Sequence, residues 1–378
     1  MRTDLRSGFT TGTCAAAAAK AAAVILCCGE IPAGAEVILP SGEKARFPLQ
    51  DWKRRESCAG CSVKKDAGDD PDVTDKAEIW SFVRRLDPAD LHKDREKWYE
   101  EADLPGVFLT GGRGVGLVTK PGLSCPVGKH AINPVPRRMI LESVYEIKKE
   151  SGEKAPLLVQ VEIPQGEELA KKTFNPRLGI LGGLSVLGTT GIVRPMSEEA
   201  LKASIDLEIH MKALDGSKYL ILSPGNYGAE FLRSRLGISL DEGVQCSNFI
   251  AHSVRAAAKE GFSRGLLAGH AGKLVKAAAG VENTHSRYGD RRMEILSGFV
   301  RELDCGQDEV ADKILDCNTT EEAVGLLETA GIGTETGNLA ADRLRDQILK
   351  WTDGKLKMDI IIFSSQRGVF GKAGEVRL

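Results

Sequence analysis

The pattern of apolar and polar residues changes near the middle of the chain. Before Pro195, short apolar runs are separated by glycine-rich stretches, whereas beyond it apolar strands alternate with helical periodicity. Repeated strand–helix units of this kind are typical of a parallel, doubly wound sheet. The pattern therefore predicts two domains, 1–194 and 195–378, of which the second is an α/β domain. Its strand-like runs in the second domain include Tyr219–Leu222, Val244–Ser247, Gly265–Ala268 and Ile360–Phe363.

The first domain carries apolar runs of several lengths. The alanine-rich stretch Ala15–Cys28 predicts a buried helix, with Thr13 as its N-cap because a hydroxyl can accept first-turn amides. Ile79–Asp103 predicts a partly exposed helix that packs through its aromatic residues. Two prolines delay the next predicted helix to Met139–Glu150. A hairpin and two further strands are predicted at Glu36–Pro40, Ala45–Leu49, Val107–Thr110 and Leu157–Ile163.

Composition narrows the classes of function. The 378 residues carry a formal net charge of −2 without a long basic run, which argues against a nucleic-acid surface, and no apolar stretch reaches a membrane-spanning length. Nine scattered cysteines predict a reducing, cytoplasmic setting without a disulfide framework. Cys58 and Cys61 have the spacing of half a zinc site, but no second pair follows. Free thiols and no protein-bound metal are therefore expected.

The residues ahead of the alanine-rich stretch, Gly8–Cys14, combine hydroxyls with glycines. Gly8 and Gly12 would let the backbone approach a ligand closely, and the amides at the start of a helix attract anions. This segment is a candidate anion cradle. The alternative is a capped, tightly packed helix without a ligand.

Four further segments have the composition of functional loops. Val63–Thr74 holds four aspartates and is either a solvated turn or an acidic loop beside an active site. Gly111–Gly116 looks like a dinucleotide fingerprint, but extended residues follow it where that motif needs a helix. Ser223–Gly228 follows a strand and precedes a helix, which suits an adenosyl or nucleotide ligand. Gly269–Lys273 resembles a phosphate loop, but its glycine spacing does not fit one.

Several blocks, in this order along the chain, together resemble the cobalt-precorrin-5B C1-methyltransferase family of the anaerobic cobalamin pathway. They are Gly8–Cys14 with the following alanines, Lys65–Thr74, Gly114–Gly116 with Thr119–Gly122, Ala131–Arg137, Gly188–Val193 and Pro224–Gly228. The helical region after Arg287 carries little of the similarity. His130 stands where the family mostly has proline, so we give it no catalytic role.

The resemblance implies that a methyl group passes from S-adenosylmethionine to C1 of a corrinoid, whose cobalt belongs to the substrate alone. It also implies an N-terminal α+β substrate-binding domain like a permuted ribosomal S5 domain 2. The C-terminal domain would be a Rossmann-like α/β domain with a parallel sheet that binds S-adenosylmethionine. A homo-oligomer is compatible with this assignment. The implied cofactor-binding residues are Ser223, Pro224, Gly225, Asn226, Tyr227, Gly228, Gly269 and His270.

A corrinoid precursor carries acetate and propionate groups, so basic residues in the matching blocks are candidate carboxylate partners. The substrate-binding candidates are Thr10, Thr11, Gly12, Thr13, Arg113, Lys120, Asn133, Arg137, Arg177 and Arg194. The catalytic candidates, should the reaction need a base, are Asp66, Asp69, Asp70 and Asp72. Two other functions stay open. One is a small-molecule kinase of the S5-like class, whose phosphate loop also precedes such a helix, and the other is a non-catalytic corrinoid carrier.

Overall fold

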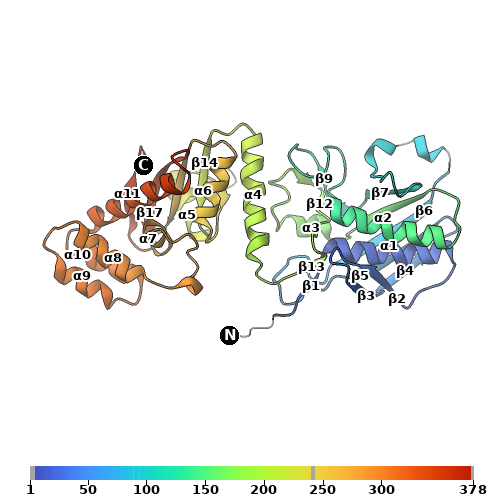
Figure 1. Ribbon diagram of the computed structural model, residues 1–378, viewed down its shortest axis with the longest axis horizontal. Helices are drawn as coiled ribbons and strands as arrows, with labels where there is room; N and C mark the ends of the chain where they lie inside the picture. The colour runs from blue at the N-terminus through green and yellow to red at the C-terminus, as the bar shows by residue number, and fades with distance from the viewer. Residues whose placement is uncertain (1–4, 88, 93, 240–242, 376–378) are drawn as a thin grey trace. The chain divides into compact units, whose positions relative to one another are not determined.

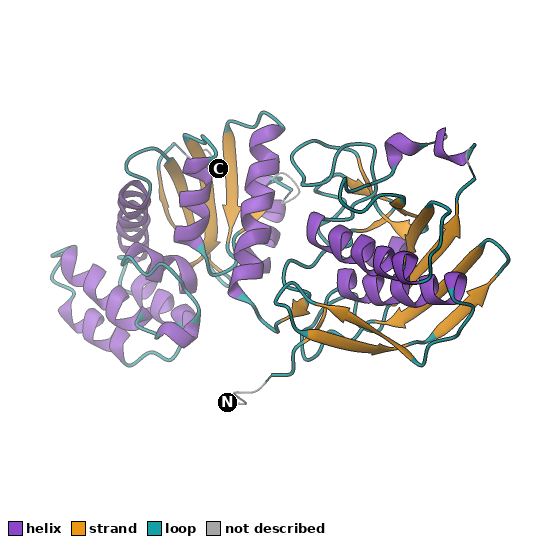
Figure 2. Ribbon diagram, turned by 45° about the vertical axis from the view of Figure 1, so that its right-hand side comes forward, coloured by secondary structure: helices purple, strands orange, loops and turns teal. Residues whose placement is uncertain are grey.

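The computed structural model describes residues 5–87, 89–92, 94–239 and 243–375. The chain divides into two compact units, Met1–Ser197 and Glu198–Leu378, called here the N-terminal and C-terminal units (Figure 1). Each unit combines helices with a mixed β-sheet (Figure 2). Within the described residues, no helix has the length and apolar character needed to cross a bilayer.

The N-terminal unit is built on a five-stranded sheet in the order β4-β5-β6-β10-β7. Strands β10 and β7 pair in parallel, and the other neighbours are antiparallel. Helices α1 (Thr11–Cys27) and α2 (Pro134–Glu150) pack side by side on this sheet, α1 over β5 and β6 and α2 beside β7 (Figure 1). The strands are β4 (Asp51–Arg54), β5 (Cys58–Lys64), β6 (Glu78–Arg85), β7 (Val107–Gly111) and β10 (Leu157–Glu162).

Helix α1 is buried on nearly all sides, and its composition allows this. Residues Ala15 to Ala19 and Ala21 to Ala23 have no exposed surface. Their small side chains let α2 and the sheet approach the helix axis closely, since the distance between packed elements follows the side chains at the contact. The hydroxyl of Ser81 in β6 donates a 2.9 Å hydrogen bond to the Ala15 carbonyl, which fixes the helix against the sheet.

Helix α1 begins earlier than its apolar pattern predicts. The prediction that Thr13 is the N-cap is wrong, because the helix starts at Thr11 and Thr10 caps it. The Thr10 hydroxyl accepts a 3.3 Å hydrogen bond from the Thr13 amide. Threonine and glycine have low helix propensity, so the first turn is not apparent in the sequence.

Helices α1 and α2 run parallel, and their N-termini lie at the same end of the unit. A β-carbon on Gly12 would lie 2.5 Å from Cγ of Pro136 near these ends. Further along, Lys20 and Glu146 form a 2.9 Å ion pair. Helix α2 begins at Pro134, not after Pro136 as predicted, because first-turn residues have no intrahelical use for an amide hydrogen.

The helix predicted over Ile79–Asp103 is wrong. Strand β6 occupies the first part of this range, followed by 3₁₀ turns at Asp90–His92 and Arg95–Lys97. Ser81 faces α1, while Trp80 and Phe82 stack on the opposite face with ring centroids 5.3 Å apart. Since both faces of the strand bear apolar side chains, the alternation that marks a half-buried strand is lost.

The described residues of the N-terminal unit also form four two-stranded sheets and a short helix, α3 (Gly166–Ala170). The predicted hairpin is confirmed as β2 with β3, and the glycine run after β7 leads into short strands without a helix, as expected. The pairs are β1 (Gly8–Phe9) with β13 (Ile192–Val193), β2 (Gly34–Ile38) with β3 (Lys44–Pro48), β8 (Gly114–Val115) with β12 (Gly183–Leu184), and β9 (Leu117–Val118) with β11 (Ile180–Leu181).

The C-terminal unit contains a five-stranded sheet in the order β15-β14-β16-β17-β18. Its first four strands are parallel, but β18 pairs antiparallel with β17, so the prediction of a parallel sheet is wrong at this edge. The turn between these two strands is too short for a crossover and permits only a hairpin. The strands are β14 (Tyr219–Ser223), β15 (Val244–Gln245), β16 (Arg264–His270), β17 (Lys357–Ser364) and β18 (Gly368–Ala373).

Helices cover both faces of this sheet. Helix α5 (Asn226–Leu236) packs on one face, where Phe231 stacks on Phe363 with ring centroids 4.3 Å apart. The core of the other face is shared with α4 (Glu198–Leu214), α6 (Ile250–Lys259), α7 (Ala271–Ala278) and α11 (Gly333–Trp351). Helices α8 (Arg292–Glu302), α9 (Asp308–Leu315) and α10 (Thr320–Thr329) lie beside them and extend the same core (Figure 1).

The strand order reverses at the pair of β14 and β16. The chain leaves β14 through α5 and returns to β15 on one side, whereas β16 lies on the other side of β14. In open α/β sheets, ligands bind outside the carboxyl ends of the strands at such a switch point. The predicted cofactor residues Ser223–Gly228 lie at the end of β14, at this switch point.

We predict that Gly12→Ala destabilises the N-terminal unit. The added methyl would overlap Pro136, and overpacking of this kind costs about 1–3 kcal/mol. That exceeds the roughly 0.5–1 kcal/mol that alanine gains over glycine inside a helix. Calorimetric unfolding, together with hydrogen exchange of α1 and α2 peptides, measures the effect.

Gly298→Ala is the matched control, because Gly298 lies inside α8 and an added β-carbon meets nothing within 4 Å. This variant should be as stable as the parent protein or more stable. A Gly12→Ala protein with unchanged stability and exchange rates would contradict the tight contact between the two helices.

Candidate active site

The hydroxyl run at the start of α1 is buried and bonded within the protein. Thr10, Thr11 and Thr13 are 6%, 5% and 0% exposed. The Thr13 hydroxyl donates a 2.8 Å hydrogen bond to the Gly191 carbonyl, and the Gly12 amide donates to the Leu187 carbonyl at 3.2 Å. Groups expected to hold an anion are thus engaged by a later segment of the same chain.

The close approaches that Gly8 and Gly12 permit are to other parts of the protein. A β-carbon on Gly8 would lie 2.1 Å from the carbonyl carbon of Ala67, and one on Gly12 would overlap Pro136. Packing within the protein therefore explains why glycine occupies these two positions, as an alternative to the expected close approach of a ligand. They allow β1 to cross the acidic loop and α1 to meet α2.

Val186–Gly191 crosses the N-terminal ends of both helices and is called here the crossing segment. The Val186 carbonyl accepts a 3.0 Å hydrogen bond from the amide of Asn133, just before α2, as Leu187 does from α1. Thr189 and Thr190 are exposed. Because two parallel helices present the positive ends of their dipoles here, the surface near the crossing segment favours anions.

The acidic loop after β5 is tied to the start of the chain by ion pairs. Arg6 forms a bidentate pair with Asp66, with N–O distances of 2.5 and 2.8 Å. Lys65, only 1% exposed, pairs with Asp72 at 2.6 Å. The Phe9 amide donates to the Asp66 carbonyl at 2.8 Å, so β1 and this loop are joined directly.

The four predicted catalytic aspartates differ in their surroundings. The hydrogen bond from Arg6 holds the pKa of Asp66 well below its usual range. Burial raises the pKa of Asp72, but hydrogen bonds from Lys65 and Thr74 outweigh burial and the net pKa is lowered. A general base works best with a pKa near the working pH, so these two carboxylates are better suited to structural ion pairs.

The other two aspartates form no ion pair in the described ranges, and each accepts a hydrogen bond from a backbone amide outside the loop. Asp69 accepts from the Arg6 amide at 2.7 Å, and Asp70 accepts from the Met196 amide at 3.2 Å. These bonds draw the acidic loop toward both the chain start and the segment after β13.

Arg137, in the first turn of α2, belongs to a basic cluster with Tyr99 and Lys129. Its guanidinium lies 4.5 Å from the Tyr99 ring centre, and the Lys129 ammonium lies 5.0 Å from the same centre. The Arg137 Nε is buried, 3.5 Å from Glu101 Oε1, and makes no hydrogen bond to any described residue. Burial and then the charge of Arg137 lower the pKa of Lys129. Asn133, at the N-cap of α2, accepts from the Cys125 thiol at 3.5 Å.

The remaining predicted carboxylate partners lie on other loops. Arg113 follows β7 and Arg194 follows β13; both are exposed, and neither has an ion pair within the described ranges. Lys120 packs on the loop that carries Arg177, since a β-carbon on Gly179 would lie 2.6 Å from Lys120 Cγ. The structure thus gathers Thr10–Thr13, Asn133 and Arg137 at one end of α1 and α2.

In the C-terminal unit, the predicted cofactor loop lies at the carboxyl end of β14. Ser223 is fully buried, and its hydroxyl has no hydrogen-bond partner among the described residues. The hydroxyl points to the first turn of α5, 1.7 Å from where a β-carbon on Gly228 would be. Gly225 has a φ of 90°, which an L side chain rarely adopts. Tyr227 is 73% exposed, while the side chain of Asn226 lies outside the described part of the chain.

The loop predicted over Gly269–Lys273 is wrong, because β16 runs directly into α7. His270 caps α7, and its Nδ1 accepts a 3.0 Å hydrogen bond from the Gly272 amide. Its Nε2 lies 2.7 Å from Oε1 of Glu321. Both ring nitrogens are therefore engaged within the protein, and only the ring faces could touch a cofactor.

Lys273 is the residue at this end of the sheet that sequence reasoning missed. Its ammonium lies 3.5 Å from the Ser247 carbonyl, just after β15, and 3.3 Å from where a β-carbon on Gly225 would be. Gly269 lets Pro224 pack onto β16, since a β-carbon there would lie 2.8 Å from Pro224 Cγ. The sequence signal for Lys273 was the glycine-containing segment Gly269–Lys273. Because its glycine spacing does not fit a phosphate loop, the lysine was not chosen as a candidate.

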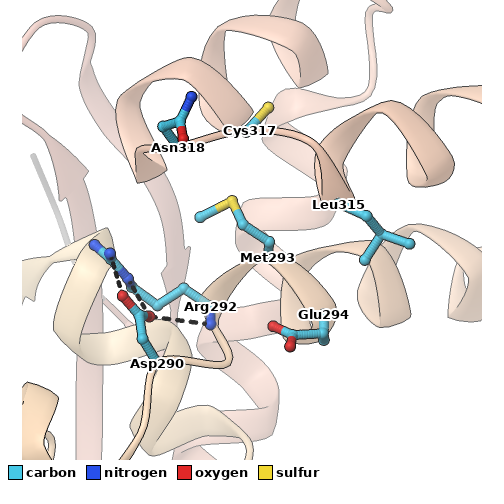
Figure 3. A pocket seen from close by; sticks show the side chains of 7 residues that line it. All are labelled: Asp290, Arg292, Met293, Glu294, Leu315, Cys317 and Asn318. Carbon is cyan, nitrogen blue, oxygen red and sulfur yellow. Dashed lines mark hydrogen bonds and ion pairs between the residues drawn. The ribbon is translucent and has the colours of Figure 1, made fainter.

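A pocket of about 420 Å³ lies between the start of α8 and the connection of α9 to α10 (Figure 3). Within it, Arg292 forms a bidentate pair with Asp290, with N–O distances of 2.6 and 2.5 Å, and donates to the Thr320 hydroxyl at 3.1 Å. The charge of this arginine is thus satisfied internally. None of the predicted site residues lines the pocket.

The described residues include no group of three or more histidine, cysteine or acidic side chains that could hold a metal. Cys58 and Cys61 are three residues apart on β5, and side chains with this separation on a strand point to opposite faces. The half zinc site noted in the sequence therefore has no geometry for chelation.

Comparison with known proteins covers both units. The family model described as CbiD matches residues 1–195, and the one described as CbiD, C-terminal domain, matches residues 283–374. A cobalt-precorrin-5B C(1)-methyltransferase of Thermoanaerobacter sp. (strain X514) is 42% identical and covers 98% of this chain and 96% of its own. Its counterpart in Alkaliphilus metalliredigens (strain QYMF) is 40% identical and covers 98% and 93%.

A crystal structure of a cobalamin biosynthesis protein (cbiD) from Archaeoglobus fulgidus is 25% identical, with a TM-score of 0.40 over 76% of this chain and 84% of that one. The family model and the near full-length identity to the curated relatives agree with the resemblance found in the sequence. The chain belongs to the CbiD family.

Proposed function

We propose that this protein methylates C1 of cobalt-precorrin-5B with S-adenosylmethionine, giving cobalt-precorrin-6A in anaerobic cobalamin biosynthesis. The observation that carries the proposal is the 42% identity to a cobalt-precorrin-5B C(1)-methyltransferase across 98% of this chain. Similarity of that extent includes both units, so the proposal gives a role to each. All nine cysteines are unpaired, which suits a reducing cytoplasmic setting.

We assign S-adenosylmethionine to the carboxyl ends of β14 and β16, and the C-terminal unit to the Rossmann-like folds. The reversal of strand order at this pair supports the assignment. The buried, unpartnered hydroxyl of Ser223 also supports it, because such a group costs about 1–3 kcal/mol unless a polar partner is supplied. Gly225, with its φ of 90°, leaves the turn after β14 open to a ligand.

We assign the corrinoid to the N-terminal unit, which we propose to be the permuted S5 domain 2-like domain. The aligned N-termini of α1 and α2 favour the carboxylates of its acetate and propionate groups. Arg137 supports this assignment, since its buried Nε makes no hydrogen bond to the described residues. Arg113 and Arg194, which are exposed and without ion pairs in the described ranges, are further partners for the same groups.

S-adenosylmethionine supplies a methyl group already activated by its sulfonium. The residues of this chain then need chiefly to bind and orient the reactants, and correct orientation alone can supply several kcal/mol of the barrier reduction. Asp69 and Asp70 are our candidates for a general base, because neither forms an ion pair within the described residues. Asp66 and Asp72 instead neutralise Arg6 and Lys65.

Anaerobic turnover of cobalt-precorrin-5B with methyl-labelled S-adenosylmethionine tests the function, and the label should appear at C1. Titration calorimetry separates the alternatives. ATP binding without S-adenosylhomocysteine binding would favour a kinase, and corrinoid binding without either would favour a carrier. No label transfer, together with no S-adenosylhomocysteine binding, would refute the proposal.

Arg137→Ala is expected to raise the KM for the corrinoid roughly tenfold or more, because a hydrogen bond to a charged group contributes about 1.5–3 kcal/mol. Arg138→Ala is the control. Arg138 is the next residue of the same helix but is engaged by Glu142 at 2.6 Å and Asp103 at 2.7 Å. Steady-state kinetics should show a KM effect for the first variant alone. Equal KM values for the two variants would remove Arg137 from the substrate site.

Gly225→Asp is expected to abolish S-adenosylhomocysteine binding, since the side chain would enter the turn after β14 and lie against Lys273. The control is Gly237→Asp at the other end of α5. Gly237 also has a positive φ, of 64°, but an added β-carbon meets nothing within 4 Å. Calorimetric titration should show binding by the control only. Retained affinity in Gly225→Asp would refute the location of the donor site.

A further inference from the structure

The C-terminal unit holds a lysine whose charge no carboxylate balances. Lys273 lies in the first turn of α7 and is half-buried. No acidic side chain in the described ranges forms an ion pair with it, and the polar contact its ammonium makes is the 3.5 Å one to the Ser247 carbonyl. Lys276, which is buried in the same helix and also has no ion pair in the described ranges, donates a 2.5 Å hydrogen bond to the Thr284 carbonyl, whereas the contact of Lys273 is long.

The position of this ammonium is set by three strands. The Ser247 carbonyl follows β15, Gly225 follows β14, and Lys273 itself follows β16. The ammonium lies 3.3 Å from where a β-carbon on Gly225 would be, so the glycine turn and the lysine face each other at the switch point. Ser247 holds its carbonyl there with a φ of 50°, a conformation that residues other than glycine rarely adopt.

Two features at the carboxyl ends of these strands indicate that a ligand binds there. The Lys273 ammonium has a 3.5 Å contact to a carbonyl and no ion pair in the described ranges, and burial lowers its pKa. Ser223, fully buried at the end of β14, has a hydroxyl without a hydrogen-bond partner among the described residues. An anionic group beside Gly225 would balance the ammonium, and Ser223 lies two residues earlier in the chain, at the end of the same strand.

We propose that Lys273 binds the carboxylate of the methionine part of S-adenosylmethionine. This inference rests on the proposed function and specifies how its donor is held. A carboxylate is the ligand group that matches a lone ammonium, and the amides at the start of α5 and α7 add to the attraction. The corrinoid also carries carboxylates, so the test must separate the two sources.

The test compares S-adenosylmethionine with decarboxylated S-adenosylmethionine, which differs by the carboxylate alone. The unmodified protein should bind S-adenosylmethionine roughly 10- to 100-fold more tightly, as expected for a charge-assisted hydrogen bond. Lys273→Met should lose that preference, with weaker binding of S-adenosylmethionine and unchanged binding of the decarboxylated compound. Lys273→Arg should keep part of the preference. Calorimetry or equilibrium dialysis measures all of these affinities without turnover.

Lys259→Met is the matched control, because Lys259 is exposed at the end of α6 in the same unit. Its preference for S-adenosylmethionine should be unchanged. Thermal unfolding checks the fold of Lys273→Met, which should be at least as stable as the parent since an unpaired desolvated charge is removed.

Other outcomes would overturn the inference. If Lys273→Met bound both compounds more weakly by the same factor, the lysine would stabilise the site without contacting the carboxylate. If its affinity for both compounds were unchanged, the lysine would not belong to the site. A raised corrinoid KM with unchanged S-adenosylmethionine affinity would assign the carboxylate to the macrocycle. If the unmodified protein bound neither compound, the proposed donor site itself would be refuted. If Gly225→Asp lost binding but Lys273→Met did not, the donor site would be supported and Lys273 would be excluded from it.

Discussion

The N-terminal unit depends on how closely α1 packs between α2 and the sheet. Alanines with no exposed surface and the contact of Gly12 with Pro136 leave no room for a displaced helix. This packing aligns the N-termini of two parallel helices, and the crossing segment bonds to both through the carbonyls of Val186 and Leu187. The electrostatic character of this end of the unit therefore follows from the packing of small residues and is not supplied by basic side chains alone.

In the C-terminal unit the corresponding constraint is the order of the strands. The reversal at β14 and β16 brings together residues that follow three different strands, and no local sequence pattern links Gly225, Ser247 and Lys273. Gly225 makes a tight turn after β14, and α7 begins at the residue after β16, so the residues at the carboxyl ends of these strands lie close together. The same topology that buries the apolar strands thus leaves polar groups gathered at one edge.

The sequence predicted elements well where a buried strand is a continuous apolar run, as at Ile360–Phe363, because the pattern and the burial then agree. It failed at β6, where Trp80 and Phe82 cover one face and Ser81 faces α1. The candidate site residues were chosen from the sequence by residue type, but their partners within the protein could not be predicted. Asp66 reads as a candidate base until Arg6, sixty residues earlier in the chain, is seen to hold it.

The partners of charged groups give a physical criterion that separates the candidates. Lys65 and Asp72 neutralise each other, and removing either would leave a charge in a poorly solvated place, which explains both residues by stability alone. Lys273 has no ion pair in the described ranges and a 3.5 Å contact to a carbonyl, whereas Lys276 and Lys148, which also lack an ion pair there, donate to carbonyls at 2.5 and 2.7 Å. Stability therefore explains Lys273 less well than it explains those two lysines. Proteins accept such uncompensated groups where binding requires them. By this criterion we assign the aspartates held by cations to the scaffold, and we propose the lysine at the switch point for the site.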